Sequence, residues 1–305
     1  MKALVHDPHA AHGLRLGEAP DPTPRRSQAL VEVGAVSLNF ADLAFLSDRV
    51  AAGAVPGFDA SGTIVAADAA GSGPPAGARV ATFGFSGAWA ERRAVDTTEL
   101  AVLPDAVDLG SAAAVPAAGV TALRAVRRLG SILGRRVLIT GASGGVGRFA
   151  VQLAALAGAD VVAAVGSAEH GAGLARLGAS EVVVGLADVD DPVDAALDNI
   201  GGQTLAGVQA LLRPGGLALS VGMASLEPTT IDFEAARMRA AGARIEAFVV
   251  GSGFADDLAY LVSLLDAGRL DPQIGWRGPW DRANEAAAAL MGRRVRGKAV
   301  LEVTS

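Results

Sequence analysis

The sequence predicts an α/β protein built from two parts, and three observations support this prediction. The first third of the chain contains many short strand-like segments separated by turn residues. From about residue 112 onward, apolar strand candidates alternate with helical patterns of about ten or more residues. In mid-chain, at residues 135–156, a strand is followed at once by a glycine cluster and an amphipathic helix. The alternation predicts a doubly wound parallel sheet, next to a separate β-rich unit.

The composition excludes several classes of protein. Of the 305 residues, 51% are hydrophobic and 19% are charged, which is typical of a globular chain long enough for two domains. The net charge of -6 offers no basic surface for nucleic acid, and no apolar stretch is long enough to span a bilayer. The first residues do not resemble a signal peptide, so we expect a cytoplasmic protein without nucleic-acid or membrane partners. The absence of cysteine excludes disulfides, thiolate chemistry and cysteine-containing zinc sites.

Short strand patterns dominate the first 112 residues. Prolines at positions 20, 22 and 24 mark a loop, and the Gly- and Pro-rich segment 71–75 marks a turn. Many short strands with little helix predict a compact β-rich unit. The strand candidates are residues 2–6, 14–17, 29–35, 62–67, 79–83, 88–94 and 100–103.

In the middle of the chain, residue patterns typical of strands and of helices alternate. Gly178 and Gly215 fall where two of the helices should end. The strand candidates are residues 137–140, 160–165, 181–184, 195–199, 217–221 and 243–250, and the helix candidates are residues 112–129, 148–157, 169–177, 203–212 and 233–238.

The last 55 residues change again, with helices predicted at 255–267 and 285–291 and a final strand at 297–303. A parallel sheet that already has six strands leaves no obvious place for this strand, so we expect the tail to return to the β-rich unit. The predicted division therefore assigns residues 1–112 and 251–305 to one domain and residues 113–250 to the other.

The mid-chain glycine cluster indicates a dinucleotide site. Val137–Ile139 is a short strand pattern, four glycines lie within residues 141–147, and the helix pattern covers residues 149–156. Strand, glycine turn and helix bring backbone close to a diphosphate and aim the positive end of a helix at its charge. Short-chain dehydrogenases carry a similar glycine pattern but need a Tyr-x-x-x-Lys pair. The only tyrosine here is Tyr260, and position 264 is Leu264, so that alternative fails.

Several segments, in this order, resemble the medium-chain dehydrogenase/reductase superfamily, and within it the zinc-free quinone oxidoreductase and enoyl reductase branch. The resemblance implies a GroES-like β-rich catalytic domain, a Rossmann domain, and a nicotinamide cofactor between the two. It also implies reduction of a quinone or of a carbon-carbon double bond conjugated to a carbonyl, and homodimers formed through the strand at 243–250. The segments that carry it are residues 38–42, 56–62, 118–122, 142–147, 197–202 and 297–301.

The resemblance also implies a set of cofactor-binding residues. Asn39 and Thr121 would lie near the nicotinamide ribose, and Val249 and Val250 would lie beside the nicotinamide ring. Each has a simpler alternative: Asn39 as a helix N-cap, Thr121 as capping or packing, and the valines as ordinary strand core. The full predicted set is Asn39, Thr121, Ala142, Gly144, Gly145, Val146, Gly147, Ser167, His170, Gly222, Val249, Val250 and Lys298.

The choice between NADPH and NADH depends on the end of the second strand of the nucleotide-binding unit. An acidic residue there binds the adenosine ribose hydroxyls and favours NAD, whereas this chain has Ser167. A hydroxyl tolerates a phosphate on the ribose, so NADPH is favoured over NADH. His170 stands where relatives that use NADPH often have lysine, Arg176 would support a phosphate, and Glu169 would oppose it. The alternative is that Ser167 is only a helix N-cap.

The proton donor for such a reduction is less evident. Many quinone reductases have a tyrosine in the loop after the Asn39 region, but residues 46–55 contain none. The remaining candidates are His170, Asp42 and solvent. An alternative from another class is a protein that binds NADPH and a partner without turnover.

Three further sets of residues have a functional and a simpler interpretation. His6, His9 and His12 are spaced three apart in a strand-turn-strand pattern, which does not bring them to one face, so no metal site is expected. Asp59 is interpreted as structural, holding a loop near the site. The aromatic residues predicted to line an open cleft for a flat substrate are Phe40, Phe45, Phe58, Phe85, Trp89, Phe254 and Trp276, with core packing as the alternative.

Overall fold

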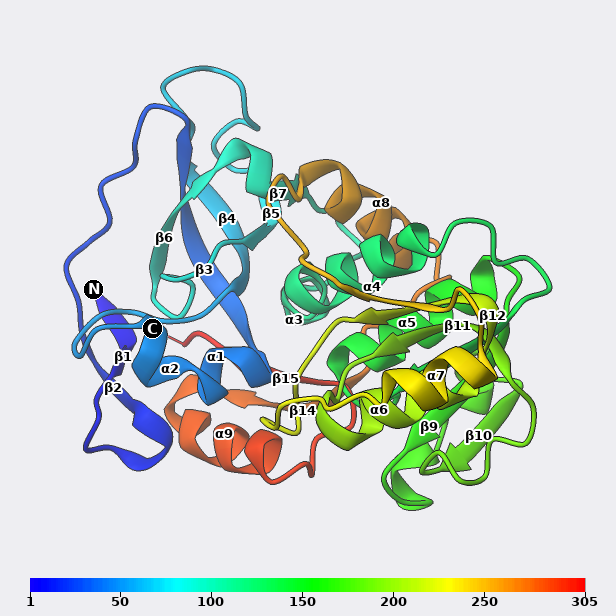
Figure 1. The fold of residues 1–305 in the computed structure, drawn as a ribbon. Coiled ribbons are helices and arrows are strands. Elements are labelled where there is room, and N and C mark those ends of the chain that lie inside the picture. The colour runs from blue at the N-terminus through cyan, green and yellow to red at the C-terminus, as the bar shows by residue number, and fades with distance from the viewer. Residues whose placement is uncertain (305) are drawn as a thin grey trace. The chain divides into compact units, whose positions relative to one another are not determined.

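The protein is described by a computed structural model that covers residues 1–304 (Figure 1). The chain divides into two compact units. Residues 1–120 and 252–304 form the first unit, and residues 121–251 form the second. The sequence places the first boundary at residue 112, whereas the contacts place it at 120, inside helix α4 (Pro116–Arg128).

The first unit is built around a seven-stranded sheet that is mostly antiparallel. Its order is β14-β15-β3-β4-β5-β7, and β6 pairs with the other end of the long strand β3. The bounds are β3 (Gln28–Leu38), β4 (Asp59–Ala66), β5 (Arg79–Phe83), β6 (Arg92–Asp96), β7 (Leu100–Val102), β14 (Ile274–Pro279) and β15 (Lys298–Glu302). A separate hairpin joins β1 (Lys2–His6) to β2 (Leu14–Glu18).

The C-terminal strand confirms that the tail returns to the β-rich unit. β15 pairs antiparallel with β3, with Ala299 opposite Leu38, and Figure 1 shows red β15 beside blue β3. Trp89, Trp280, Leu4 and Leu38 are fully buried in the main core cluster of this unit. Its helical elements are α1 (Phe40–Ala44), α2 (Leu46–Arg49), α3 (Leu109–Ala113), α8 (Ala255–Asp266) and α9 (Ala283–Met291), with turns η1 (Ala11–Gly13), η2 (Thr97–Glu99) and η5 (Trp280–Arg282).

The second unit is a six-stranded parallel sheet of order β10-β9-β8-β11-β12-β13. Counted from β8, this is the order 3-2-1-4-5-6 of a Rossmann fold, which confirms the predicted fold class. Figure 1 shows α6 and α7 side by side, and α6 packs on β11 and β12. The bounds are β8 (Arg136–Thr140), β9 (Asp160–Val165), β10 (Glu181–Val184), β11 (Val193–Asp198), β12 (Leu212–Ser220), β13 (Arg244–Ala247), α5 (Gly145–Leu156), α6 (Gly202–Leu211) and α7 (Phe233–Arg239).

The strand order reverses between the neighbouring strands β8 and β11. Ligands of doubly wound sheets bind outside the carboxyl ends of the strands at this switch point. The glycine cluster at 141–147 follows β8 directly, so the fold places it at the switch point. No helix within residues 1–304 has the length and apolar character that a bilayer crossing requires.

Several predicted elements were wrong in their bounds or type. The helix expected at 169–177 is two short turns, η3 (Glu169–Gly171) and η4 (Ala175–Leu177), because Gly173 between them has a φ of +84°. The helix expected at 112–129 is divided between α3 and α4, and proline is favourable in the first turn at which α4 begins. The strand expected at 243–250 ends at Ala247, where its partner β12 also ends.

Two further differences concern the β-rich unit. The strand expected at 88–94 starts only at Arg92, and Ala90 forms an isolated bridge to Ala3 instead. Strand β14 was not expected, because glycines at 275 and 278 and a proline at 279 interrupt its pattern.

Candidate functional site

The glycine turn lies between β8 and α5 and has no room for side chains at its tightest point. A Cβ atom on Gly147 would stand 2.3 Å from the carbonyl oxygen of Gly141 and 2.7 Å from Cα of Ala142. Both neighbours are backbone, so the first turn of α5 packs directly on the turn that precedes it. Gly141 has a φ of +56°, in the left-handed region that favours glycine.

The N-terminus of α5 has no side-chain cap. Gly144 is the N-cap residue, and it has no side chain to accept hydrogen bonds from the first-turn N–H groups. Those groups have no intrahelical acceptors, and they lie at the positive end of the helix dipole. An uncapped end of a 12-residue helix beside a bare-backbone turn fits the diphosphate of a dinucleotide. Gly144, Gly145, Val146 and Gly147 are the residues that would hold it.

The ends of β8, β11 and β12 are tied together beside the turn. The buried Asp198 carboxylate accepts hydrogen bonds from Thr140 Oγ1 at 2.6 Å and from Gly201 N at 2.7 Å. Burial raises the pKa of Asp198. Asn199 Nδ2 donates to the carbonyl oxygen of Thr140 at 2.8 Å, and a Cβ on Gly222 would stand 2.8 Å from Asn199 O. Glycine is therefore required at position 222 by the close approach of the backbone that follows β11.

The end of β9 carries the residues predicted to select the cofactor. Ser167 is half-buried, and its carbonyl oxygen accepts from His170 N at 3.1 Å. Arg148 was not expected at this place: it is buried in the first turn of α5, and its guanidinium donates to Ser143 O and Ala172 O. Arg148 thus joins the glycine turn to the segment that follows β9. Arg176 lies exposed in η4.

A polar cluster is buried in the first unit, where β3, β4 and β15 meet. Lys298, which is 2% exposed, contacts Asn39 Oδ1 and forms an ion pair of 3.3 Å with Asp59 Oδ2. Asn39 Nδ2 donates to Asp59 Oδ2 at 2.9 Å and to Asp42 Oδ2 at 3.0 Å. Asp59 Oδ1 accepts from Ala117 N at 2.8 Å, so Asp59 also holds the start of α4. We refer to Asn39, Asp42, Asp59 and Lys298 as the Lys298 cluster.

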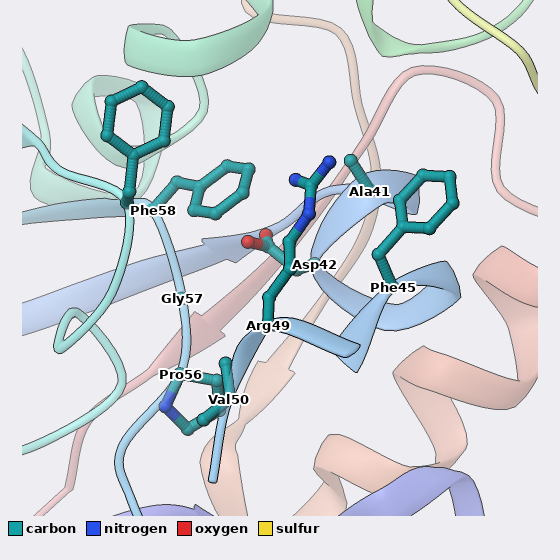
Figure 2. Close-up of a pocket in the computed structure, with 9 residues that line it drawn as sticks. Ala41, Asp42, Phe45, Arg49, Val50, Pro56, Gly57 and Phe58 are labelled. Atoms are coloured by element: carbon teal, nitrogen blue, oxygen red, sulfur yellow. The ribbon is translucent and has the colours of Figure 1, made fainter. Parts of the chain in front are cut away.

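A pocket opens beside the Lys298 cluster (Figure 2). In Figure 2 the Asp42 carboxyl points toward Phe58, and Arg49 rises next to it. Oδ1 of Asp42 is buried, and no hydrogen-bond partner reaches it among the described residues. Burial, and to a lesser extent Asp59, raise the pKa of Asp42 to about 7. The lining residues are Ala41, Asp42, Phe45, Arg49, Val50, Pro56, Gly57, Phe58 and Phe85.

The predicted site residues therefore fall into two sets, one in each unit. The Rossmann set gathers around the glycine turn and the ends of β9 and β12, and Ala142 is buried at its centre. Asn39 and Lys298 belong to the buried cluster of the β-rich unit. Thr121 lies in the second turn of α4. Val249 and Val250 lie beyond β13 rather than in it, and Val249 is 83% exposed.

The aromatic residues divide between core and pocket. Phe45, Phe58 and Phe85 line the pocket, whereas Trp89 and Phe254 are fully buried, which corrects their expected place in an open cleft. The Trp89 indole packs directly against Gly57, where an added Cβ atom would stand 2.2 Å from the ring. Across residues 1–304, no group of three or more His, Asp or Glu side chains is arranged to hold a metal ion.

Two family models match the chain, and they cover both units. Residues 25–105 match the alcohol dehydrogenase GroES-like domain, and residues 176–301 match a model described as zinc-binding dehydrogenase. Solved structures of quinone oxidoreductases match the whole fold. The chain belongs to the medium-chain dehydrogenase/reductase superfamily, in its quinone oxidoreductase branch. This member of the superfamily has no cysteine, although one of the matching models is named for zinc.

Individual relatives of this medium-chain dehydrogenase/reductase cover nearly its full length. It is 28% identical to the chloroplast envelope quinone oxidoreductase homolog of Arabidopsis thaliana, over 99% of this chain and 98% of the relative. It is 33% identical to erythronolide synthase EryA2 of Saccharopolyspora erythraea over 91% of this chain, which spans only 8% of that longer protein.

Two solved structures superpose on the whole chain. The quinone oxidoreductase of Coxiella burnetii has a TM-score of 0.86 and 26% identity, covering 100% of this chain and 99% of the other. A mycobacterial protein complexed with NADPH has a TM-score of 0.89, 24% identity and coverage of 99% of each chain, which shows a shared fold.

Proposed function

We propose that this oxidoreductase transfers a hydride from NADPH to a quinone or to an α,β-unsaturated carbonyl compound, without zinc. The observation that carries the proposal is the bare-backbone turn at 141–147 with the uncapped helix α5 behind it. Membership of the quinone oxidoreductase branch supports the reaction type. The lack of cysteine supports chemistry without zinc, because catalytic zinc in the metal-dependent branch uses a cysteine ligand.

NADPH is proposed over NADH because no carboxylate occurs in residues 166–168, directly after β9. The carboxylate that binds the ribose hydroxyls in NAD-specific Rossmann domains would repel a phosphate at the same position. Ser167 and His170 are the proposed neighbours of that phosphate, and Arg148 fixes the segment in which they lie. The NADPH complex of the mycobacterial protein of the same fold is consistent with this choice.

Residues of the nicotinamide half are also proposed. Asn39, Thr121, Val249 and Val250 would contact the ribose and the ring. The Asn39 amide is already engaged, because both hydrogens of Nδ2 are donated to carboxylates and Oδ1 faces Lys298. We therefore propose that Lys298 acts by fixing Asn39, since its own ammonium is buried.

The direct test is to follow nicotinamide absorbance while the protein is mixed with NADPH and phenanthrenequinone or an aryl enone. We expect NADPH to be oxidised in proportion to enzyme, and NADH to be a poorer donor in kcat/KM. Binding of NADPH without oxidation across quinones and enones would favour the alternative, a protein that binds the nucleotide without turnover.

A further inference from the structure

We propose that Arg148 and Arg176 determine the preference for NADPH, because their guanidinium groups meet over Gly173 and can bind the 2′-phosphate of the adenosine ribose together. The inference rests on the proposed function and deepens it. It names the groups that recognise this phosphate, for which the sequence offers His170 where many relatives that use NADPH have lysine.

Arg148 is fixed between the two segments that the adenosine half of the nucleotide would contact. It lies in the first turn of α5 and is only 5% exposed. Its Nε donates to the carbonyl oxygen of Ser143 in the glycine turn at 3.2 Å, and its Nη2 donates to that of Ala172 at 2.9 Å. The glycine turn follows β8, and Ala172 lies in the segment that follows β9. The adenosine ribose of a dinucleotide binds on this side of a Rossmann sheet, so Arg148 holds a positive charge beside it.

Arg176 brings a second guanidinium group to the same place from η4. Nη2 of Arg176 lies 3.4 Å, and Nη1 of Arg148 lies 3.8 Å, from the point that a Cβ atom on Gly173 would occupy. The two nitrogens are therefore no more than about 7 Å apart, which is the sum of these distances. Arg176 is exposed, and it forms no ion pair with a carboxylate among residues 1–304. Two like charges this close repel each other, so an anion between them would stabilise the arrangement.

Gly173 keeps the space between the two guanidinium groups open. Apart from Gly173 and its chain neighbours, the two arginine nitrogens are the only heavy atoms of the described residues within 4 Å of the Cβ position. Gly173 has a φ of +84°, in the left-handed region that favours glycine. It also separates η3 from η4, where the sequence predicts one continuous helix. The backbone thus leaves a space that is lined by two positively charged groups.

A phosphate monoester is the anion that fits this space. Guanidinium groups bind phosphate through charge-assisted hydrogen bonds about 2.8 Å long, and a phosphate that accepts one from each arginine can bridge the two nitrogens. In NADP-dependent Rossmann domains an arginine near the end of the second strand accommodates the 2′-phosphate. NADH has a hydroxyl at that position, and it would leave the two charges without an anion.

The other groups of the segment do not cancel this charge. Glu169 is the only acidic residue in positions 166–178, so two arginines stand against one carboxylate. Ser167 is half-buried, and its carbonyl oxygen already accepts from the backbone N of His170 at 3.1 Å. The guanidinium group stays charged throughout the physiological pH range, whereas imidazole does not. The two arginines are therefore preferred over His170 as the groups that select the phosphate.

The test compares Arg176→Gln with the matched control Arg239→Gln. Arg239 is an exposed arginine on α7, which precedes the opposite edge strand β13, so its replacement removes the same charge far along the sheet. Calorimetry on the whole protein measures the Kd of adenosine 2′,5′-bisphosphate and of adenosine 5′-monophosphate, which differ only in the 2′-phosphate. We expect the wild type to bind the bisphosphate about 100-fold more tightly. R176Q should lower this ratio about tenfold by weakening the bisphosphate alone, and R239Q should match the wild type.

Arg148→Lys tests the buried partner. Lysine keeps the positive charge but has no planar fork to hold both carbonyl oxygens, so the ratio should fall several-fold. Because Arg148 is buried, this variant is compared only if its Tm matches the wild type; otherwise R176Q alone decides.

A kinetic readout separates phosphate recognition from a general structural effect. In R176Q the KM for NADPH should rise about tenfold at an unchanged kcat, and the KM for NADH should not change, because the 2′-phosphate takes no part in hydride transfer. A wild type that binds neither adenosine nucleotide would overturn the proposed function. A wild type that binds both nucleotides equally, an R176Q variant with the wild-type ratio, or an equal rise of both KM values would overturn this inference alone.

Discussion

At the residue scale, the Lys298 cluster shows how a few side chains set one another's chemistry. Lys298 neutralises Asp59, and both orient Asn39, which in turn satisfies one oxygen of Asp42. The second Asp42 oxygen is left without a partner among the described residues. A buried polar atom without a hydrogen bond costs about 1–3 kcal/mol, and such costs concentrate at functional sites. Burial and the Asp59 carboxylate favour a neutral Asp42, against the hydrogen bonds from Asn39 and the charge of Lys298.

The neutral state of Asp42 predicts a pH-dependent stability. Its folded pKa of about 7 lies above the ordinary value of 3.8, so the folded state binds this proton more tightly than the unfolded state. The contribution is fully present below about pH 4 and is lost as pH rises through 7. Relative to D42N, the wild type should lose about 2–4 kcal/mol of unfolding free energy between about pH 4 and 8. Urea unfolding of both proteins across that range measures it, and parallel pH profiles would contradict it.

At the element scale, the N-terminus of α5 has no side-chain cap. Gly144 has φ -77° and ψ 178°, a conformation open to any residue, and a Cβ there would stand 3.4 Å from Gly141 O. An aspartate would fit and would be one of the best N-cap residues for helix stability. The presence of glycine instead leaves the first-turn N–H groups free for a ligand's anion.

This reasoning predicts opposite effects on stability and binding for Gly144→Asp. Its carboxylate should cap α5 and keep Tm at or slightly above the wild-type value, because Asp exceeds Gly by a few tenths of a kcal/mol as an N-cap. The same carboxylate should occupy and repel the diphosphate site, weakening NADPH binding by at least about 100-fold. Gly144→Ala adds the Cβ without charge and should weaken binding much less. Thermal unfolding and fluorescence titration measure both effects; a G144D variant that binds NADPH normally would remove the turn from the cofactor site.

At the scale of the whole molecule, the sequence predicts those features of the fold that depend on local residue patterns. The strand, glycine turn and helix at 135–156 and the return of strand 298–302 to β3 follow from periodicity and order along the chain. The Lys298 cluster joins residues 39, 59 and 298, so its contacts appear only after folding. The sequence predicts Asn39, Asp42 and Lys298 individually as candidate site residues. It does not predict the hydrogen bonds and the ion pair that join them. Asp198 and Arg148 are also not predicted as site residues, because no sequence pattern distinguishes them from other residues at a strand end or in a first helical turn.

The Rossmann sheet predicts the assembly state. Strand β13 is an edge strand in the described part of the chain, and Phe233, Met238 and Val249 nearby in sequence are more than 70% exposed. Exposed edges and apolar side chains favour pairing with a second copy. We propose a homodimer and expect light scattering at micromolar concentration to give twice 30.5 kDa. Replacing Ile245 by lysine on β13 should shift the mass toward the monomer. A wild-type mass of one chain would contradict the proposal.

The central claim is that the enzyme moves a hydride from the nicotinamide to a conjugated carbonyl substrate. The most direct measurement uses NADPH deuterated at the transferable position of its nicotinamide, an aryl enone, and mass spectrometry of the product. The account predicts a saturated ketone with one deuterium on its β-carbon and a solvent-derived hydrogen on its α-carbon. A product without deuterium, or an unchanged enone in the presence of tightly bound NADPH, would contradict it.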